Sequence, residues 1–144
     1  MKEEYNPTYA SMIKETLDKI SSDAFEKIDK IDRYPEEIGR KLFIVLIEYA
    51  CKSYNLNPIM ISRDLIKQIP EDWLYRHFIE IADKCLCYED DWEYCRLLEL
   101  LYLVAPKILK WAIDKGIDSS NIDIRDGAKY FNNKLNNLIK EELL

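Results

Sequence analysis

Residues that end helices or form tight turns are scarce in this chain, which has 3 glycines and 5 prolines among 144 residues. Its β-branched residues are mainly isoleucines scattered among leucine, glutamate, lysine and aspartate, a mixture that favours helices over strands. Apolar residues make up 48% and charged residues 33%, which supplies a core and argues against disorder. We therefore expect a single all-α domain over residues 1–144, formed as a compact bundle or short right-handed superhelix of about six to seven helices.

Long apolar stretches are also lacking. The longest runs over residues 42–47, far short of the roughly 20 residues that a membrane-spanning helix needs. The N-terminal sequence Met-Lys-Glu-Glu has no apolar segment of the kind found in signal peptides. We expect a cytoplasmic protein that does not interact with membranes.

The usual catalytic and metal-binding motifs are missing. With His77 as the only histidine, neither a His-Glu-x-x-His zinc site nor a helical di-iron site can form. No glycine-rich phosphate loop or nucleophile elbow is visible. Cys85, Cys87 and Cys95 resemble metal ligands most closely, but residues two apart on a helix point to nearly opposite sides. We expect reduced thiols, no metal, no cofactor, no catalytic residue and no enzyme activity.

Helix boundaries are predicted from prolines, caps and apolar spacing. The chain should form a helix from Pro7 to about residue 22, then a short segment that carries Ile28 and Ile31. Further helices are expected over residues 35–54, 70–87, 92–105 and 107–116, followed by a last helix from residue 122. Residues 59–69 should form a shorter helix or a pair of turns. Gly116 is the expected end of the helix that precedes the turn at residues 118–121.

The charge balance favours a basic partner. There are 27 acidic and 21 basic side chains, which give a formal net charge of −6 and repel nucleic-acid phosphates on average. We therefore expect no nucleic-acid partner. Basic residues in the last third could still form a local stripe, which leaves an enzyme acting on nucleic acid as an alternative. They are Lys107, Lys110, Lys115, Arg125, Lys129 and Lys134.

Acidic and aromatic residues are interleaved around residues 75–94. Exposed tyrosine and tryptophan are typical anchors of protein interfaces, and an acidic patch steers a basic partner to its site. Trp73 and Trp92 fit the apolar stripes of their helices and are expected in the core, whereas the tyrosines should show a face to solvent. A solvated charged rim is the alternative interpretation. The candidate partner-binding residues are Tyr75, Glu80, Asp83, Tyr88, Glu89, Asp90, Asp91, Glu93 and Tyr94.

The stretch at residues 121–131 resembles the signature of HEAT repeats, in which an Asp is followed by an aliphatic residue, an Arg and, three positions on, a small residue. Asp123, Ile124, Arg125 and Ala128 match that order. In HEAT-like repeats the Asp and Arg stabilise the turn and stack successive repeats, so the resemblance implies a HEAT-like C-terminal half.

Together with the helix-and-proline segment before it, this part of the chain, about residues 71–138, resembles small bacterial HEAT-like immunity proteins of polymorphic or contact-dependent toxin systems. The resemblance implies a protein that binds and neutralises a cognate toxin, often a basic nuclease. Alternatives are a helical scaffold or regulatory adaptor, or an enzyme on a helical-repeat scaffold. A homodimer is also an alternative, because aromatic surfaces self-associate.

Overall fold

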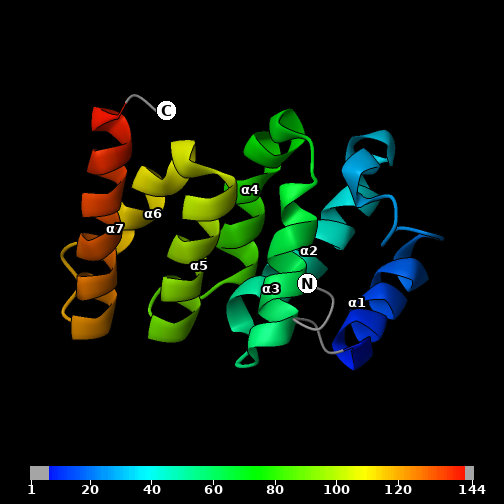
Figure 1. The fold of residues 1–144 in the computed structure, drawn as a ribbon, viewed down its shortest axis with the longest axis horizontal. Coiled ribbons are helices and arrows are strands. Elements are labelled where there is room, and N and C mark those ends of the chain that lie inside the picture. The colour runs from blue at the N-terminus through cyan, green and yellow to red at the C-terminus, as the bar shows by residue number, and fades with distance from the viewer. Residues whose placement is uncertain (1–6, 142–144) are drawn as a thin grey trace. The chain divides into compact units, whose positions relative to one another are not determined.

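The computed structural model describes residues 7–141, and within that range it is all-α and has no strand. Its helices group into two compact units, one ending at Cys85 and the other beginning at Leu86. The expected all-α class is confirmed. The single domain stays a prediction, because contacts cluster separately within each unit, and each unit is therefore described by itself. Figure 1 shows the helices of both units coloured along the chain.

In the first unit, α2 is the central helix. It contacts α1, α3 and α4, while α1 and the 3-10 helix η2 also contact α3. Phe43 of α2 packs edge-on against Trp73 and Phe78 of α4, with ring centroids 5.9 and 5.6 Å apart. Burying each such ring contributes roughly 1.5–3 kcal/mol. The helices are α1 (Pro7–Ile20), η2 (Ile28–Arg33), α2 (Glu36–Lys52), α3 (Leu56–Lys67) and α4 (Glu71–Cys85).

Two local features of the first unit add detail to the prediction or differ from it. The segment after α1 is a turn followed by a 3-10 helix, since Asp23 has a φ of 62° and the Asp18 carboxylate accepts the Phe25 N–H at 3.0 Å. The third helix begins at Leu56 rather than near residue 59. Asn55 caps it by accepting the Asn57 N–H at 3.0 Å, and Pro58 fits in the first turn, where a backbone N–H is not needed.

The second unit contains α5 (Asp91–Val104), η3 (Pro106–Ile108), α6 (Leu109–Gly116) and α7 (Ile122–Lys140), and each α-helix contacts the other two. Pro106 lacks a backbone N–H and opens the short 3-10 turn between α5 and α6, as its sequence position predicts. Helix α6 ends at Gly116, also as predicted. The apolar side of α7 is buried through Ile124, Ala128 and Phe131.

The residues that carry the HEAT resemblance lie in the first turns of α7, directly after the turn that joins α6 to α7. The Asn121 side chain caps α7 by accepting the N–H groups of Asp123 and Ile124 at 2.9 and 3.2 Å. Arg125 donates to the Ser119 carbonyl at 3.3 Å, so this guanidinium does hold the turn. Assignment to the HEAT repeats stays a prediction.

Candidate functional site

Two carboxylates of the predicted acidic patch hold the start of α5. The Asp90 side chain caps the helix by accepting the Glu93 N–H at 3.0 Å. Glu93 reaches back to accept the Cys87 N–H, also at 3.0 Å. The arrangement resembles a capping box and satisfies backbone donors at a helix end. Asp90 and Glu93 therefore have a structural role, and only part of their hydrogen-bonding capacity is left for a partner.

Tyr88 lies in the same turn and is half-buried. Its ring meets Trp111 of α6 edge-on, with centroids 5.8 Å apart. The Lys115 ammonium lies 4.6 Å from the Tyr88 ring and 5.1 Å from the Trp111 ring, both within cation–π range. These contacts fix the tyrosine against α6 while part of its surface remains exposed. The expectation that Tyr88 shows a face to solvent is confirmed.

The expectation that Tyr94 faces solvent is wrong. Its side chain is fully buried, and its hydroxyl donates to the Ala112 carbonyl at 2.6 Å. Burial raises the pKa of the phenol far above its usual value, so the hydroxyl stays protonated and remains a donor. Tyr94 lies on the side of α5 that faces α6. It is a core residue and does not form part of a binding surface.

The predicted residues that precede the turn belong to the first unit. Tyr75 is half-buried, and Glu80 and Asp83 are exposed on α4. Glu80 accepts a hydrogen bond from the Arg40 guanidinium at 2.8 Å, and this bond lowers the pKa of its carboxyl group. The nine candidate residues are thus divided between the two units. Trp73 is buried as expected, whereas Trp92 is only half-buried beneath the guanidinium of Arg96, 4.2 Å from its ring.

A hollow of about 640 Å³ lies beside Tyr88 and Glu89 in the second unit. Asp114 and Lys115 at the end of α6 line it, as do the residues of the following turn. Tyr88 and Glu89 thus lie beside a loop about thirty positions later in the sequence. We call this feature the acidic hollow; it is lined by Tyr88, Glu89, Asp114, Lys115, Asp118, Ser119, Ser120, Asn121 and Ile124.

The acidic hollow contains more negative than positive groups. Glu89, Asp114 and Asp118 are exposed, and Lys115 is the one basic residue in the lining. Asp114 also forms an ion pair with Lys110. General acid catalysis by a carboxyl group needs a site shielded from water, and these groups are exposed to solvent. The arrangement suits electrostatic recognition of a basic surface better than proton transfer.

The turn at residues 118–121 is recognisable from the sequence, but its position beside Tyr88 is not. Asp118, Ser119, Ser120 and Asn121 are small polar residues of the kind that fill any loop. They become part of a site because α6 packs on α7 and because Tyr88 contacts Trp111 and Lys115. Packing alone creates this proximity, and no local sequence pattern specifies it.

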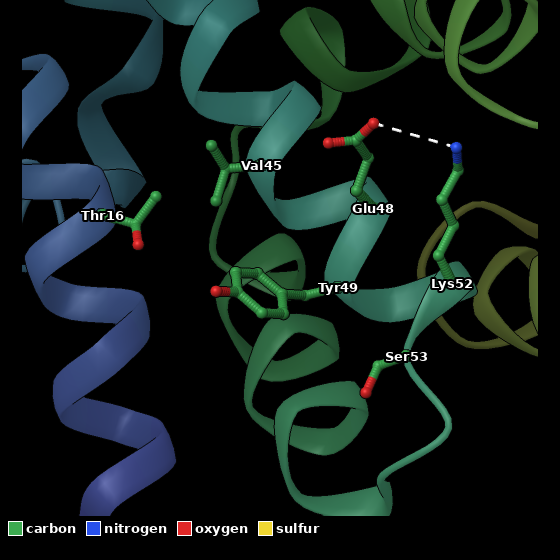
Figure 2. A pocket seen from close by; sticks show the side chains of 6 residues that line it. All are labelled: Thr16, Val45, Glu48, Tyr49, Lys52 and Ser53. Carbon is green, nitrogen blue, oxygen red and sulfur yellow. Dashed lines mark ion pairs between the residues drawn. The ribbon is translucent and has the colours of Figure 1, made fainter.

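A second hollow, of about 460 Å³, lies in the first unit between α1 and α2. Figure 2 shows Tyr49 directed from α2 towards α1, with Thr16 on the facing helix and Val45 one turn before Tyr49. At its rim, Glu48 and Lys52 form an ion pair at 3.9 Å, so their charges offset each other. This hollow contains neither excess charge nor a nucleophile beside a base.

Within the described residues, the cysteine thiols are free and no metal site is formed. Burial raises the pKa values of Cys85 and Cys95, which keeps both thiols protonated and poorly nucleophilic. Among residues 7–141, no three His, Cys, Asp or Glu side chains converge closely enough to hold a metal ion. In the same part of the chain, no helix combines the length and apolar character needed to cross a membrane.

Comparison of the chain with known protein families, with curated proteins and with solved structures finds no match in any of the three.

Proposed function

We propose that this protein is a protein-binding module, an immunity protein that binds and neutralises a cognate bacterial toxin with a basic surface. The observation that carries the proposal is the acidic hollow, where three exposed carboxylates lie beside a fixed aromatic ring. Tyr88 would be the anchor, because Trp111 and Lys115 already hold its ring and little side-chain entropy is lost on binding.

Charge supports the same proposal. The formal net charge of −6 attracts a basic protein over a distance of about one Debye length, roughly 8 Å at physiological salt. Glu89 and Asp118 then act at close range on lysine or arginine side chains of the toxin. Such complementarity raises the association rate and disfavours acidic competitors.

The resemblance to HEAT-like immunity proteins gives independent support. It covers about residues 71–138 and includes the signature at residues 123–128, where Arg125 makes the turn contact expected of the signature arginine. That turn lines the acidic hollow through Ser119 and Asn121. In this proposal the repeat-like turn positions part of the toxin-binding surface.

The proposal is tested by co-expressing the tagged protein with the product of the adjacent gene and measuring the affinity of any stoichiometric complex at several salt concentrations. The variant Glu89→Lys/Asp118→Lys reverses two carboxylates of the hollow and leaves the cap residue Asp90 intact. Its matched control is Asp126→Lys/Glu141→Lys, which makes the same charge change at two exposed positions that do not line the hollow.

We expect a basic toxin domain as the partner, with affinity that falls as salt rises. Placing like charges across the interface costs several kcal/mol, so the hollow variant should lose about 100-fold or more in affinity. The affinity of the control variant should fall less, because its substitutions change only the net charge of the protein. Equal losses in the two variants would contradict the assignment of the hollow, and a partner that is not a toxin would contradict the immunity role.

A further inference from the structure

A third hollow, of about 520 Å³, lies wholly within the first unit, where η2 ends and where α2 and α4 begin. Four carboxylates line it: Asp32, Glu36, Glu71 and Asp72. The one basic residue in the lining is Arg76. We call this feature the His77 hollow, after the histidine in its wall. Its charge is negative overall, and it shares no residue with the acidic hollow.

His77 presents an unsatisfied hydrogen-bond donor there. The residue is only 4% exposed, and its Nδ1 lies 3.4 Å from the Arg40 guanidinium. A guanidinium can only donate, so Nδ1 is the acceptor and Nε2 carries the proton of the neutral ring. Nε2 lies 3.9 Å from the nearest Glu36 oxygen, which is too far for a hydrogen bond.

The protonation state agrees with this arrangement. Burial lowers the pKa of His77, with Arg40 and Arg76 acting in the same direction, while the negative charges of Glu36 and Glu80 oppose them. The ring is therefore neutral near pH 7, with one nitrogen accepting and the other donating.

Tyr34 adds a second unsatisfied group to the same wall. Its hydroxyl is buried and has no hydrogen-bond partner among the residues that the structure describes. Buried polar groups in folded proteins nearly always have a partner from the protein, from water or from a ligand. Tyr34 and His77 both line the hollow, and the buried phenolic oxygen of Tyr34 can donate or accept.

The carboxylates are arranged for an organic cation and not for a metal ion. Within residues 7–141, Asp32, Glu71 and Asp72 take part in no ion pair, so their charge is open to a ligand. They do not converge closely enough with one another or with His77 to form a metal site. Several carboxylates that do not converge on one point match the separated N–H groups of a guanidinium.

We propose that the His77 hollow binds a guanidinium cation, as in an arginine side chain, whose molecule also carries a carbonyl or carboxylate oxygen. The carboxylates accept the N–H groups of the cation, and His77 Nε2–H donates to the ligand oxygen. The volume lies within the usual range for small-ligand sites, about 300–1,000 Å³. The source of the cation is a free amino acid or a side chain on a peptide.

The test uses the only histidine in the chain as its reporter. The imidazole resonances of His77 are followed by NMR while the full-length protein is titrated with L-arginine, with a capped Gly-Arg-Gly peptide, and with citrulline as the neutral isostere. Agmatine, which keeps the guanidinium and lacks the carboxylate, tests the role of the ligand oxygen. The same titrations are then run on three variants.

Glu36→Gln and Asp72→Asn each remove one carboxylate from the hollow at an exposed position. Glu37→Gln is the matched control, since it lies in the same first turn of α2 and does not line the hollow. All three neutralise one charge near a helix N-terminus, so their effects on helix stability should be similar. Circular dichroism spectra and thermal unfolding verify that each variant is folded.

We expect saturable shifts with L-arginine, with the peptide or with both, and the ligand that binds identifies the source of the cation. Each hollow variant should weaken binding by about tenfold, as the loss of one charge-assisted hydrogen bond does, while Glu37→Gln stays within about twofold of the original protein. Citrulline should not bind, and agmatine should bind more weakly than arginine. Absence of saturation with either arginine ligand, or equal binding of citrulline, would overturn the proposal.

Discussion

Replacing Gly116 by alanine tests the packing of the second unit. Helix propensity and side-chain packing predict changes of opposite sign in the free energy of unfolding. Gly116 is the last residue of α6, and its φ is not positive, so alanine is free of backbone strain there. Helix propensity alone would make the alanine variant more stable by up to about 1 kcal/mol. Packing predicts the reverse, because a methyl group would point into the ring of Tyr94.

The size of the packing effect follows from the distances. A Cβ built at Gly116 would lie 2.5 Å from the Tyr94 hydroxyl oxygen and 2.6 and 2.7 Å from two ring carbons. The ring has little room to move, since it is fully buried and its hydroxyl is bonded to the Ala112 carbonyl. Overpacking of this kind costs about 1–3 kcal/mol and outweighs the gain in propensity. We expect Gly116→Ala to lower the free energy of unfolding by about 1–2 kcal/mol.

The measurement is urea denaturation followed by far-ultraviolet circular dichroism, with Trp fluorescence as a second probe. Gly127→Ala is the matched control within the same unit. A Cβ at Gly127 would lie 3.0 Å from the Cys95 sulfur, the end of a movable side chain that is itself half-buried. The free energy of unfolding of the Gly127→Ala variant should equal that of the original protein or be slightly higher. A Gly116→Ala protein as stable as the original would refute the close packing of Tyr94 on α6.

Two further predictions concern stability. The pKa of His77 is lowered by burial from its ordinary value of 6.5, so the unfolded chain binds this proton more readily than the folded one. The free energy of unfolding should therefore fall as the pH drops from about 7.5 through 6.5, and NMR titration of the single histidine should give a pKa below that value. Asp90→Ala should cost about 1 kcal/mol through loss of the cap on α5. Asp91→Ala in the same turn should cost less in matched urea titrations, and equal costs would contradict the capping role.

Much of the helical pattern was predictable because its determinants are local. Pro70 followed by Glu71 and Asp72 specifies the start of α4, since proline is favoured at a helix start and acids stabilise the first turn. Pro106 and Gly116 mark the two ends of the segment that contains η3 and α6. In each case the physical cause lies within a few residues along the chain.

The segment at residues 21–33 was harder to predict, because apolar spacing does not distinguish an α-helix from a 3-10 helix in so short a stretch. Ile28 and Ile31 are both buried, as the spacing requires. Asp23, with its positive φ, and the long-range bond from the Phe25 N–H to Asp18 set the actual path of the chain. Those features depend on the side-chain packing of a particular turn and carry no periodic signal.

Tyr94 shows why a partner-binding site was harder to predict than a helix. Tyrosine is amphipathic, and its place near acidic residues suited either an interface or the core. Its hydroxyl donates to a carbonyl of α6, a contact that depends on how α5 and α6 pack. Periodicity placed the residue on a helix correctly. The Ala112 carbonyl, which accepts a hydrogen bond from the buried hydroxyl and offsets the cost of burying it, lies eighteen residues further along the chain.

The acidic residues are equivalent by composition, but they differ in the hydrogen bonds that their carboxylates make within the protein. Asp90 and Glu93 accept hydrogen bonds from backbone N–H groups, and Glu80 accepts one from Arg40. A partner that bound these carboxylates would have to compete with those bonds. Glu89 is exposed and borders the acidic hollow, and its carboxylate accepts a hydrogen bond from the Cys87 thiol at 3.7 Å. Recognition by charge should therefore depend more on Glu89 and Asp118 than on the acids that cap α5. Local acidity indicated the turn that we propose for binding, and the hydrogen bonds within it determine which carboxylates remain available.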